Sequence, residues 1–256
     1  MTLYRFPAIA CLALFFLMAC DKKTDLDIAD RKAVAAGFRL KAVVNNAQDT
    51  LEQYTYDAQQ RMAAATVRVA DRYVFKYTDG ATLPAGMNNI TFTYEQSKLT
   101  AVTGPRTVTA IEYPDADRIV IRQTRYPLIP KQPPVKDTLI LYRNASRVIN
   151  RAALLPEGSV ASFTYDNNPI AYTNITDYLL PVLLQYPLKE MIPSLVAAYS
   201  GHNLLRYTLG PGITAGEVPV MKTTDYAYRF DQLLFDVPTM QEQHSVTTDK
   251  VYFLYY

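Results

Sequence analysis

The chain has 256 residues, of which 49% are apolar, and it contains 20 Tyr, 10 Phe and no Trp. The formal net charge is only +2 and no basic stripe runs along the sequence, so nucleic-acid binding has no support. The apolar content is sufficient for a sizeable core within one domain. The excess of Tyr favours β-sheet, because Tyr suits a strand face that is partly wet.

Residues 1–19 have the layout of a secretory signal. Arg5 supplies one positive charge, the nearly unbroken apolar run 6–16 follows, and the sequence becomes charged directly after Cys20. A transmembrane helix needs roughly 20 apolar residues, and this run is shorter. The sequence Leu17-Met18-Ala19-Cys20 resembles the bacterial lipobox, in which the cysteine becomes the lipid-bearing N-terminus of the mature chain. We therefore expect cleavage after residue 19 and a lipid such as palmitate on Cys20.

Cysteine usage agrees with this interpretation. Cys11 lies in the signal, so Cys20 would be the only thiol of the mature chain, and no disulfide could form within it. The alternative is an ordinary cysteine after an ordinary cleavage site. Residues 20–34 are typical of a charged, solvated tether, although in some Gram-negative lineages such charges direct a lipoprotein to the cell surface. We expect a cell-envelope protein that the lipid on Cys20 holds at the outer membrane, on its periplasmic or its outer face.

Residues 35–256 are expected to form one domain built from a repeated β unit. Each unit is an alternating strand that ends in Tyr, then a short turn rich in Asp, Asn and Ser, then a new strand. In the best copy Ile90, Phe92 and Tyr94 alternate with threonines, which places the apolar side chains on one face. The units predict hairpins in an antiparallel meander whose tyrosines share one buried face. The copies lie at 51–62, 90–99, 113–119, 139–148, 163–166 and 226–233, and the chain ends on a strand at 251–256.

The dipeptides Tyr56-Asp57 and Tyr165-Asp166 give these hairpins a resemblance to YD repeats. The whole arrangement has a lipobox, a charged tether, Tyr-rich hairpins and an apolar insertion. In this it is similar to a family of uncharacterised bacterial outer-membrane lipoproteins. The resemblance implies an all-β fold, either a curved sheet or a porin-like partial barrel. It brings no catalytic residues that could be assigned to this chain.

One segment, 174–201, departs from the β pattern. It is long and apolar, and Pro181, Pro187 and Pro193 interrupt it at six-residue intervals. Pro187 suits the first turn of a helix that runs to Tyr199, with Gly201 as its stop and Pro193 as a kink. We expect one or two short helices laid across the sheet or the barrel mouth.

This insertion is expected to cover the apolar face of the meander and to form the wall of any binding site. Leaving its apolar side chains in water would create a large exposed patch. A second interpretation is that the prolines let the segment hinge over a hydrophobic pocket. The side chains expected in the binding wall are Tyr178, Leu184, Met191 and Tyr199.

Candidate catalytic and metal-binding residues are few. His202 and His244 lie 42 residues apart without neighbouring metal ligands, and there is neither a Gly-x-Ser-x-Gly motif nor a Gly-rich phosphate loop. We therefore expect no catalytic residue, no metal and no cofactor. Asp115 and Asp117 could chelate Ca²⁺, but short carboxylates at a turn more often cap it.

Two functions remain open. The favoured hypothesis is a non-enzymatic, lipid-anchored β scaffold that binds an envelope protein, a glycan or a lipid. The alternative is an envelope polysaccharide hydrolase that uses paired turn carboxylates. Two carboxyl groups within about 10 Å of each other in one cleft would favour the hydrolase.

Overall fold

The computed structural model describes residues 39–67, 71–129, 131–172, 174–211, 222–230, 238–244 and 248–255. The predicted signal, residues 1–19, and the predicted tether, residues 20–34, lie outside these ranges, and so does Cys20. The statements below concern the described residues.

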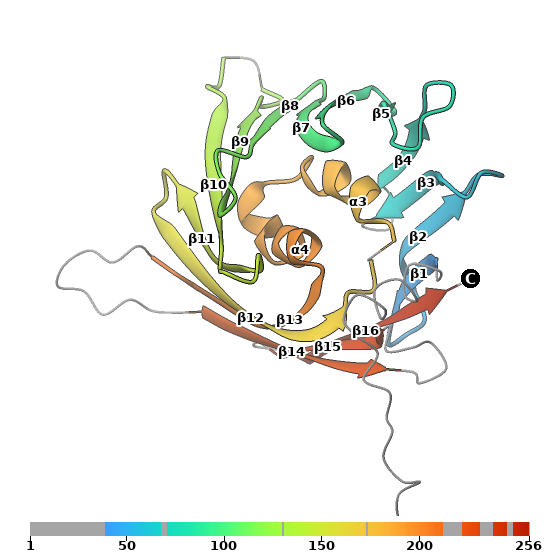
Figure 1. The fold of residues 1–256 in the computed structure, drawn as a ribbon, viewed down its shortest axis with the longest axis vertical. Helices are drawn as coiled ribbons and strands as arrows, with labels where there is room; N and C mark the ends of the chain where they lie inside the picture. The colour runs from blue at the N-terminus through green and yellow to red at the C-terminus, as the bar shows by residue number, and fades with distance from the viewer. Residues whose placement is uncertain are drawn as a thin grey trace, which may run out of the picture.

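Among these residues, sixteen antiparallel strands follow one another in chain order around a closed barrel. Figure 1 shows the strands as a ring. The predicted all-β meander is confirmed, but the barrel is closed rather than partial, because β1 pairs with β16 from Asn45↔Val251 to Leu40↔Tyr255. The strands are β1 (Leu40–Asn45), β2 (Thr50–Tyr56), β3 (Met62–Val67), β4 (Asp71–Lys76), β5 (Gly86–Met87), β6 (Ile90–Glu95), β7 (Lys98–Thr103), β8 (Thr107–Glu112), β9 (Arg118–Arg125), β10 (Val135–Arg143), β11 (Ile149–Leu155), β12 (Ser159–Pro169), β13 (His202–Gly210), β14 (Lys222–Phe230), β15 (Pro238–His244) and β16 (Thr248–Tyr255).

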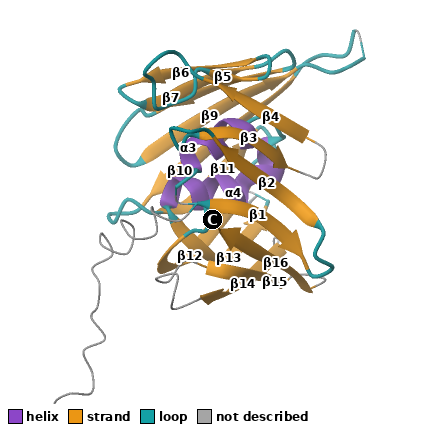
Figure 2. Cartoon of the chain, turned by 90° about the vertical axis from the view of Figure 1, so that its right-hand side faces the viewer, coloured by secondary structure: helices purple, strands orange, loops and turns teal. Residues whose placement is uncertain are grey.

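Two helices, α3 (Thr176–Leu183) and α4 (Leu188–Ser200), lie inside the barrel (Figures 1 and 2). Of the two expected placements, across the sheet or across the barrel mouth, the structure shows the first, because the helices pack on the inner, apolar face of the sheet. A ring of this many strands leaves an interior wider than its own side chains can fill, and the apolar insertion occupies that space. Neither helix has the length and apolar character needed to cross a membrane.

The ends of α4 follow the sequence signals closely. Pro187 has extended backbone angles and immediately precedes the helix, so it acts as the N-cap and not as part of the first turn. Gly201 adopts the left-handed conformation with φ 71°, and its N–H donates to the carbonyl of Ala197 at 2.8 Å. The predicted helix stop at Gly201 is confirmed.

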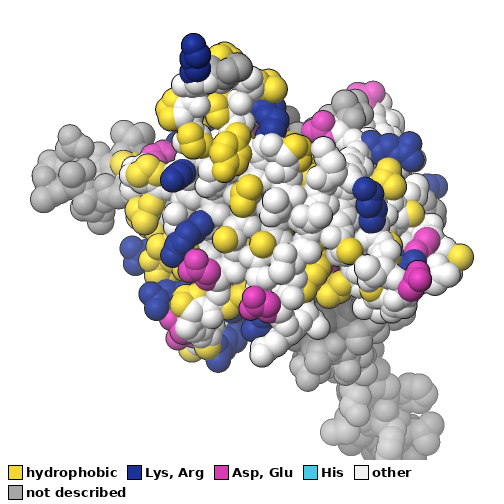
Figure 3. All heavy atoms as spheres, turned by 90° about the horizontal axis from the view of Figure 1, so that it is seen from above, with side chains coloured by type: hydrophobic (Ala, Val, Ile, Leu, Met, Phe, Trp, Pro, Cys, Tyr) yellow, Lys and Arg dark blue, Asp and Glu magenta, His cyan; other side chains and the backbone are white. Residues whose placement is uncertain are grey.

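The strand side chains that face inward are mainly apolar, and they pack against the helices. On β9 the buried Ile119 and Ile121 point inward, and the flanking Arg118 and Arg122 are exposed, whereas Val120 between the isoleucines is also buried. The same core cluster joins inward residues of nearly every strand to α3 and α4. Figure 3, which looks onto one side of the molecule, shows charged side chains of both signs scattered among uncharged ones. The barrel is thus apolar inside and mixed, with many polar groups, outside.

Tyrosines fasten neighbouring strands to each other at one end of the barrel. Because the strands are antiparallel, each even-numbered strand ends beside the start of the preceding odd-numbered strand. In five such pairs, a Tyr toward the end of the even-numbered strand donates its hydroxyl to a backbone carbonyl near the start of the odd-numbered strand. Such a bond satisfies both polar groups inside an apolar interior. The pairs are Tyr56 to Leu40 at 2.8 Å, Tyr77 to Met62 at 2.7 Å, Tyr113 to Leu99 at 3.1 Å, Tyr165 to Ile149 at 2.5 Å and Tyr228 to Leu204 at 3.0 Å.

The predicted hairpins are confirmed for most units. Gln96 and Ser97 join β6 to β7 with φ of 49° and 62°, the backbone of a two-residue hairpin turn. The Asp57 carboxylate accepts the N–H of Arg61 at 2.8 Å and closes the turn between β2 and β3. The unit at 163–166 is not a hairpin, because β12 continues past Tyr165 to Pro169 before the chain turns toward α3.

Removing one tyrosine hydroxyl should weaken the barrel by the value of one buried hydrogen bond. We expect Tyr56→Phe to lower the free energy of unfolding by about 1 kcal/mol, because the carbonyl of Leu40 loses its partner while the ring still packs. The matched control is Tyr142→Phe, whose ring lies under the guanidinium of Arg151 and belongs to no part of the core. Urea unfolding of both variants measures the difference. Equal losses would show that the hydroxyl bond to the carbonyl contributes nothing.

Candidate functional site

A cavity of about 200 Å³ lies inside the barrel, between the two helices and the side chains of β2 and β13 to β16. Here the helices leave part of the interior unfilled. Its lining combines one carboxyl, several phenols and carboxamides on the strand side with an apolar surface on the helix side. The lining residues used below are Glu52, Tyr172, Leu179, Leu183, Ser194, Ala197, Ala198, Asn203, Tyr226, Tyr228, Gln241, Gln243 and Phe253.

Glu52 is the one carboxyl group among the described residues of this lining. It lies two residues before Tyr54 on β2, so both side chains point inward from the same strand face. Its Oε2 accepts hydrogen bonds from the hydroxyl of Tyr54 and, at 3.1 Å, from the hydroxyl of Tyr172. Glu52 lies deep in the barrel, but part of its surface stays open to the cavity.

The surroundings of Glu52 act on its titration in opposite directions. Burial raises the pKa of the Glu52 carboxyl, and the hydrogen bonds from Tyr54 and Tyr172 partly oppose this effect. Burial and the nearby Glu52 raise the pKa of Tyr54, and burial raises the pKa values of Tyr226 and Tyr228. These three phenols therefore stay neutral at physiological pH and act as hydrogen-bonding groups.

The carboxamides come from β13 and β15, the two strands that flank β14 in the ring. On β15, Gln241 and Gln243 are the cross-strand partners of Tyr228 and Tyr226 on β14, so amide and phenol groups lie side by side on the cavity wall. Asn203, at the start of β13, is buried, and its amide donates to Asp166 at 3.1 Å. This wall offers both donors and acceptors.

The opposite wall is apolar. Leu179 and Leu183 of α3 and Ala198 of α4 are buried and face the cavity. Phe253 of β16 closes one side, and its ring meets the ring of Tyr172 edge to face, with centroids 5.9 Å apart. A site with one apolar wall and a few convergent polar groups suits a small ligand that has an apolar body and a polar end.

The four side chains expected in the binding wall are not among the described residues that line this cavity. Tyr178 packs edge to face on Phe75, with ring centroids 5.7 Å apart. Leu184 is fully buried, and Met191 packs partly buried against the core. Tyr199 lines two open hollows that also contain Tyr113 and Arg143. The predicted segment does supply one cavity wall, but through Leu179, Leu183, Ser194 and Ala198.

The linker between the helices is tied to the barrel wall by polar groups. The carbonyl of Leu184 accepts the side chains of Thr109 at 3.4 Å and Gln123 at 2.9 Å, and Gln123 also donates to the carbonyl of Tyr186 at 3.1 Å. The hydroxyl of Tyr186 donates to Asp71 at 2.7 Å. These bonds fix the position of the linker, and with it the helix ends, inside the ring.

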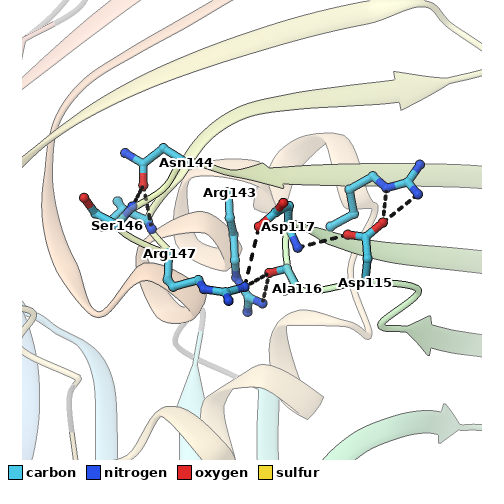
Figure 4. A network of polar contacts seen from close by, with 9 residues as sticks. Asp115, Ala116, Asp117, Arg143, Asn144, Ser146 and Arg147 are labelled. Carbon is cyan, nitrogen blue, oxygen red and sulfur yellow. Dashed lines mark hydrogen bonds and ion pairs between the residues drawn. The ribbon is translucent and has the colours of Figure 1, made fainter.

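The turn carboxylates Asp115 and Asp117 are held by arginines (Figure 4). Asp115 accepts the N–H of Asp117 at 2.9 Å and forms an ion pair with Arg118 at 2.6 Å, and the bonds from Arg118 hold the pKa of Asp115 below its usual range. Asp117 forms an ion pair with Arg147 at 3.5 Å. This arrangement is that of a capped turn.

Neither a metal site nor a glycosidase pair has support among the described residues. No group of three or more His, Cys, Asp or Glu side chains is placed to hold a metal ion there. The Glu52 cavity and the hollow beside Asp115 each have one carboxyl in their lining. His202 borders that hollow, and the side chain of His244 lies outside the description.

The sequence analysis did not identify Glu52 as a candidate site residue, although the strand pattern around it points inward. In the strand that contains Tyr54 and Tyr56, a charged residue at position 52 falls on the tyrosine face and not on the solvent face. Gln241 and Gln243 lie in a strand without apolar alternation, so their inward direction becomes visible only from their pairing with Tyr226 and Tyr228.

No family model matches the chain, and no curated protein matches it in sequence. Several solved structures are similar, among them two porin-like proteins. A porin-like protein from Bacteroides vulgatus aligns with a TM-score of 0.52 and 12% identity over 85% of this chain and 98% of that chain. A porin-like protein from Bacteroides uniformis aligns with a TM-score of 0.38 and 11% identity over 86% of this chain and 97% of that chain. The first likeness confirms the porin-like barrel fold that the resemblance implied; the YD-repeat and lipoprotein parts of that resemblance have no match in these comparisons.

The buried carboxyl of Glu52 should make stability depend on pH. An unfolded Glu titrates near a pKa of about 4.3, and burial raises the folded pKa. The folded state therefore holds its proton more tightly, and stability falls as pH rises from the unfolded pKa through the folded one. Glu52→Gln removes this loss while keeping an acceptor for Tyr54. We expect E52Q to have a higher Tm than the wild type near pH 7.5, with the gain gone near pH 4.

The matched control is Glu112→Gln, which changes a half-exposed carboxyl paired with Arg122 on the outer wall. Thermal unfolding across that pH range, followed by circular dichroism, makes the comparison. If the Tm difference between E52Q and the wild type were the same at both ends of the range, the expected rise of the Glu52 pKa on folding would be contradicted.

Proposed function

We propose that this chain is an exported envelope protein that a lipid anchors to the membrane. Its barrel would be surrounded by water, its lumen is filled by its own helices, and the Glu52 cavity would bind a small molecule. The protein would act as a binding module and neither as a pore nor as an enzyme. The observation that carries the proposal is the direction of the strand side chains, which are apolar toward the helices and mixed, with exposed charged pairs, toward the outside.

The composition of the outer wall supports the proposal that water surrounds the barrel. A transmembrane barrel presents an apolar band about 25 Å tall to lipid, and an Arg or Lys at the middle of that band costs roughly 2–4 kcal/mol. Here the ion pairs Arg122 with Glu112 and Arg206 with Asp225 lie on the outer face of the strands, at 3.2 and 2.6 Å. The strand residues among the exposed large apolar side chains, Val74, Val108, Val135, Leu155 and Leu205, are spread over five strands.

The packing of the interior supports a barrel whose lumen is filled by its own helices. The helices share one apolar core with the wall, and residues such as Leu188, Leu195 and Val196 of α4 are fully buried in it. The polar bonds of the linker to Gln123 and Asp71 add fixed attachments. A solute would have to displace this core to pass, which argues against permeation as the function.

The lipid anchor is proposed from the signal and lipobox at residues 1–20. It would hold a water-exposed barrel at the outer membrane, facing the periplasm or the cell surface. The size of the cavity limits the class of ligand that such a module can bind. The cavity is too small for a folded protein domain or a long glycan and suits a small molecule.

Removal of the anchor separates this proposal from a pore. Mass spectrometry of the membrane-purified protein should find a diacylglyceryl group on Cys20, and Cys20→Ser should give a folded barrel that stays in solution without detergent. In planar bilayers neither form should give step conductance, because the interior is filled. A Cys20→Ser protein that still partitions wholly into membranes, or steady conductance from either form, would contradict the proposal.

A further inference from the structure

We infer that the Glu52 cavity binds a small organic cation, an amine or a quaternary ammonium ion with a compact apolar body. This inference rests on the proposed binding function and names the class of ligand. It is carried by three features of the lining: its charge, its aromatic faces and its size.

The charge of the lining selects the sign of the ligand. Among the described residues that line the cavity, Glu52 is the one Asp, Glu, Lys, Arg or His side chain. A buried carboxylate without a cation is costly, and a ligand that brings a positive charge offsets the cost, whereas an anion adds to it. The two phenol hydroxyls on Oε2 hold the carboxylate in place for such a partner.

The aromatic side chains add to the same preference. The rings of Tyr172, Tyr226, Tyr228 and Phe253 all border the cavity. Aromatic faces attract cations, and the attraction is stronger in a site shielded from water. The side chains of Gln241 and Gln243 present carbonyl oxygens that can accept N–H groups of a protonated amine.

The size of the cavity and its apolar wall limit the rest of the ligand. About 200 Å³ is below the usual range of drug-sized sites, roughly 300–1,000 Å³, so the ligand is a small molecule with a single charged group. Leu179, Leu183 and Ala198 give its body an apolar surface to cover.

Binding should also depend on pH. The groups that face Glu52 are Tyr54 and Tyr172, with Tyr226 and Tyr228 across the cavity, and burial keeps Tyr54, Tyr226 and Tyr228 neutral. Glu52 is therefore the group near the ligand that changes charge. A cation binds its ionised form, so affinity should rise with pH until the carboxyl is fully ionised.

The test uses three probes of similar shape: cyclohexylamine, which is protonated, neutral cyclohexanol and anionic cyclohexanecarboxylate. Isothermal titration calorimetry on the Cys20→Ser protein should find cyclohexylamine bound about tenfold or more tightly than cyclohexanol near pH 7.5, with the carboxylate weakest. Affinity for the amine should fall toward pH 5. Glu52→Gln, checked for an unchanged fold by circular dichroism, should lose the preference for the amine, while Glu112→Gln should keep it.

A second variant fixes the location. Ala197 of α4 is half-buried and lines the cavity, so Ala197→Phe should fill it and abolish binding of every probe. Unchanged binding to this variant would overturn the cavity as the site. Equal affinity for the amine and cyclohexanol would overturn the cation inference and leave the binding function standing. If no probe bound the Cys20→Ser protein at millimolar concentration, the proposed binding function itself would be wrong.

Discussion

The structure depends on one constraint, which is that a closed ring of sixteen strands encloses more space than its own side chains can fill. Helices α3 and α4 occupy that space, and this explains why the inward strand faces are apolar. The outward faces are then free to be polar. The Glu52 cavity follows from the same constraint, because two short helices in a wide ring leave one side of the interior unfilled.

The tyrosine bonds explain how the ring holds its register at one end. A Tyr hydroxyl that reaches the carbonyl of the neighbouring strand, as Tyr56 reaches Leu40 and Tyr228 reaches Leu204, joins strand ends that the ladder alone leaves free to fray. The repeated Tyr of the sequence therefore serves the fold. The Glu52 region uses the same residue type differently, since Tyr54 and Tyr172 bond to a carboxylate.

Local pattern predicted the strands of the Tyr-ending units, most hairpins, the start of α4 near Pro187 and its end at Gly201, because each depends on neighbours in sequence. Strands β1, β4, β5 and β13 lie outside those units and were not predicted. Closure depends on β1 meeting β16, and the position of the helices depends on the width of the ring, so neither could be predicted locally. The cavity likewise brings together Glu52 of β2 and Gln241 of β15, which come near each other only because β1 pairs with β16. The unit at 163–166 failed because a Tyr-Asp dipeptide does not by itself end a strand.

The central claim is that water, and not lipid, surrounds the barrel of the membrane-anchored protein. Thr93 on β6 and Thr223 on β14 are exposed on well-separated parts of the outer wall. Thr93→Cys and Thr223→Cys, each carrying a fluorophore in the lipidated protein on liposomes, report their surroundings through quenching. The account predicts strong quenching of both by iodide in the buffer and none by nitroxides on the lipid chains. Quenching by the lipid nitroxides at both positions would contradict it.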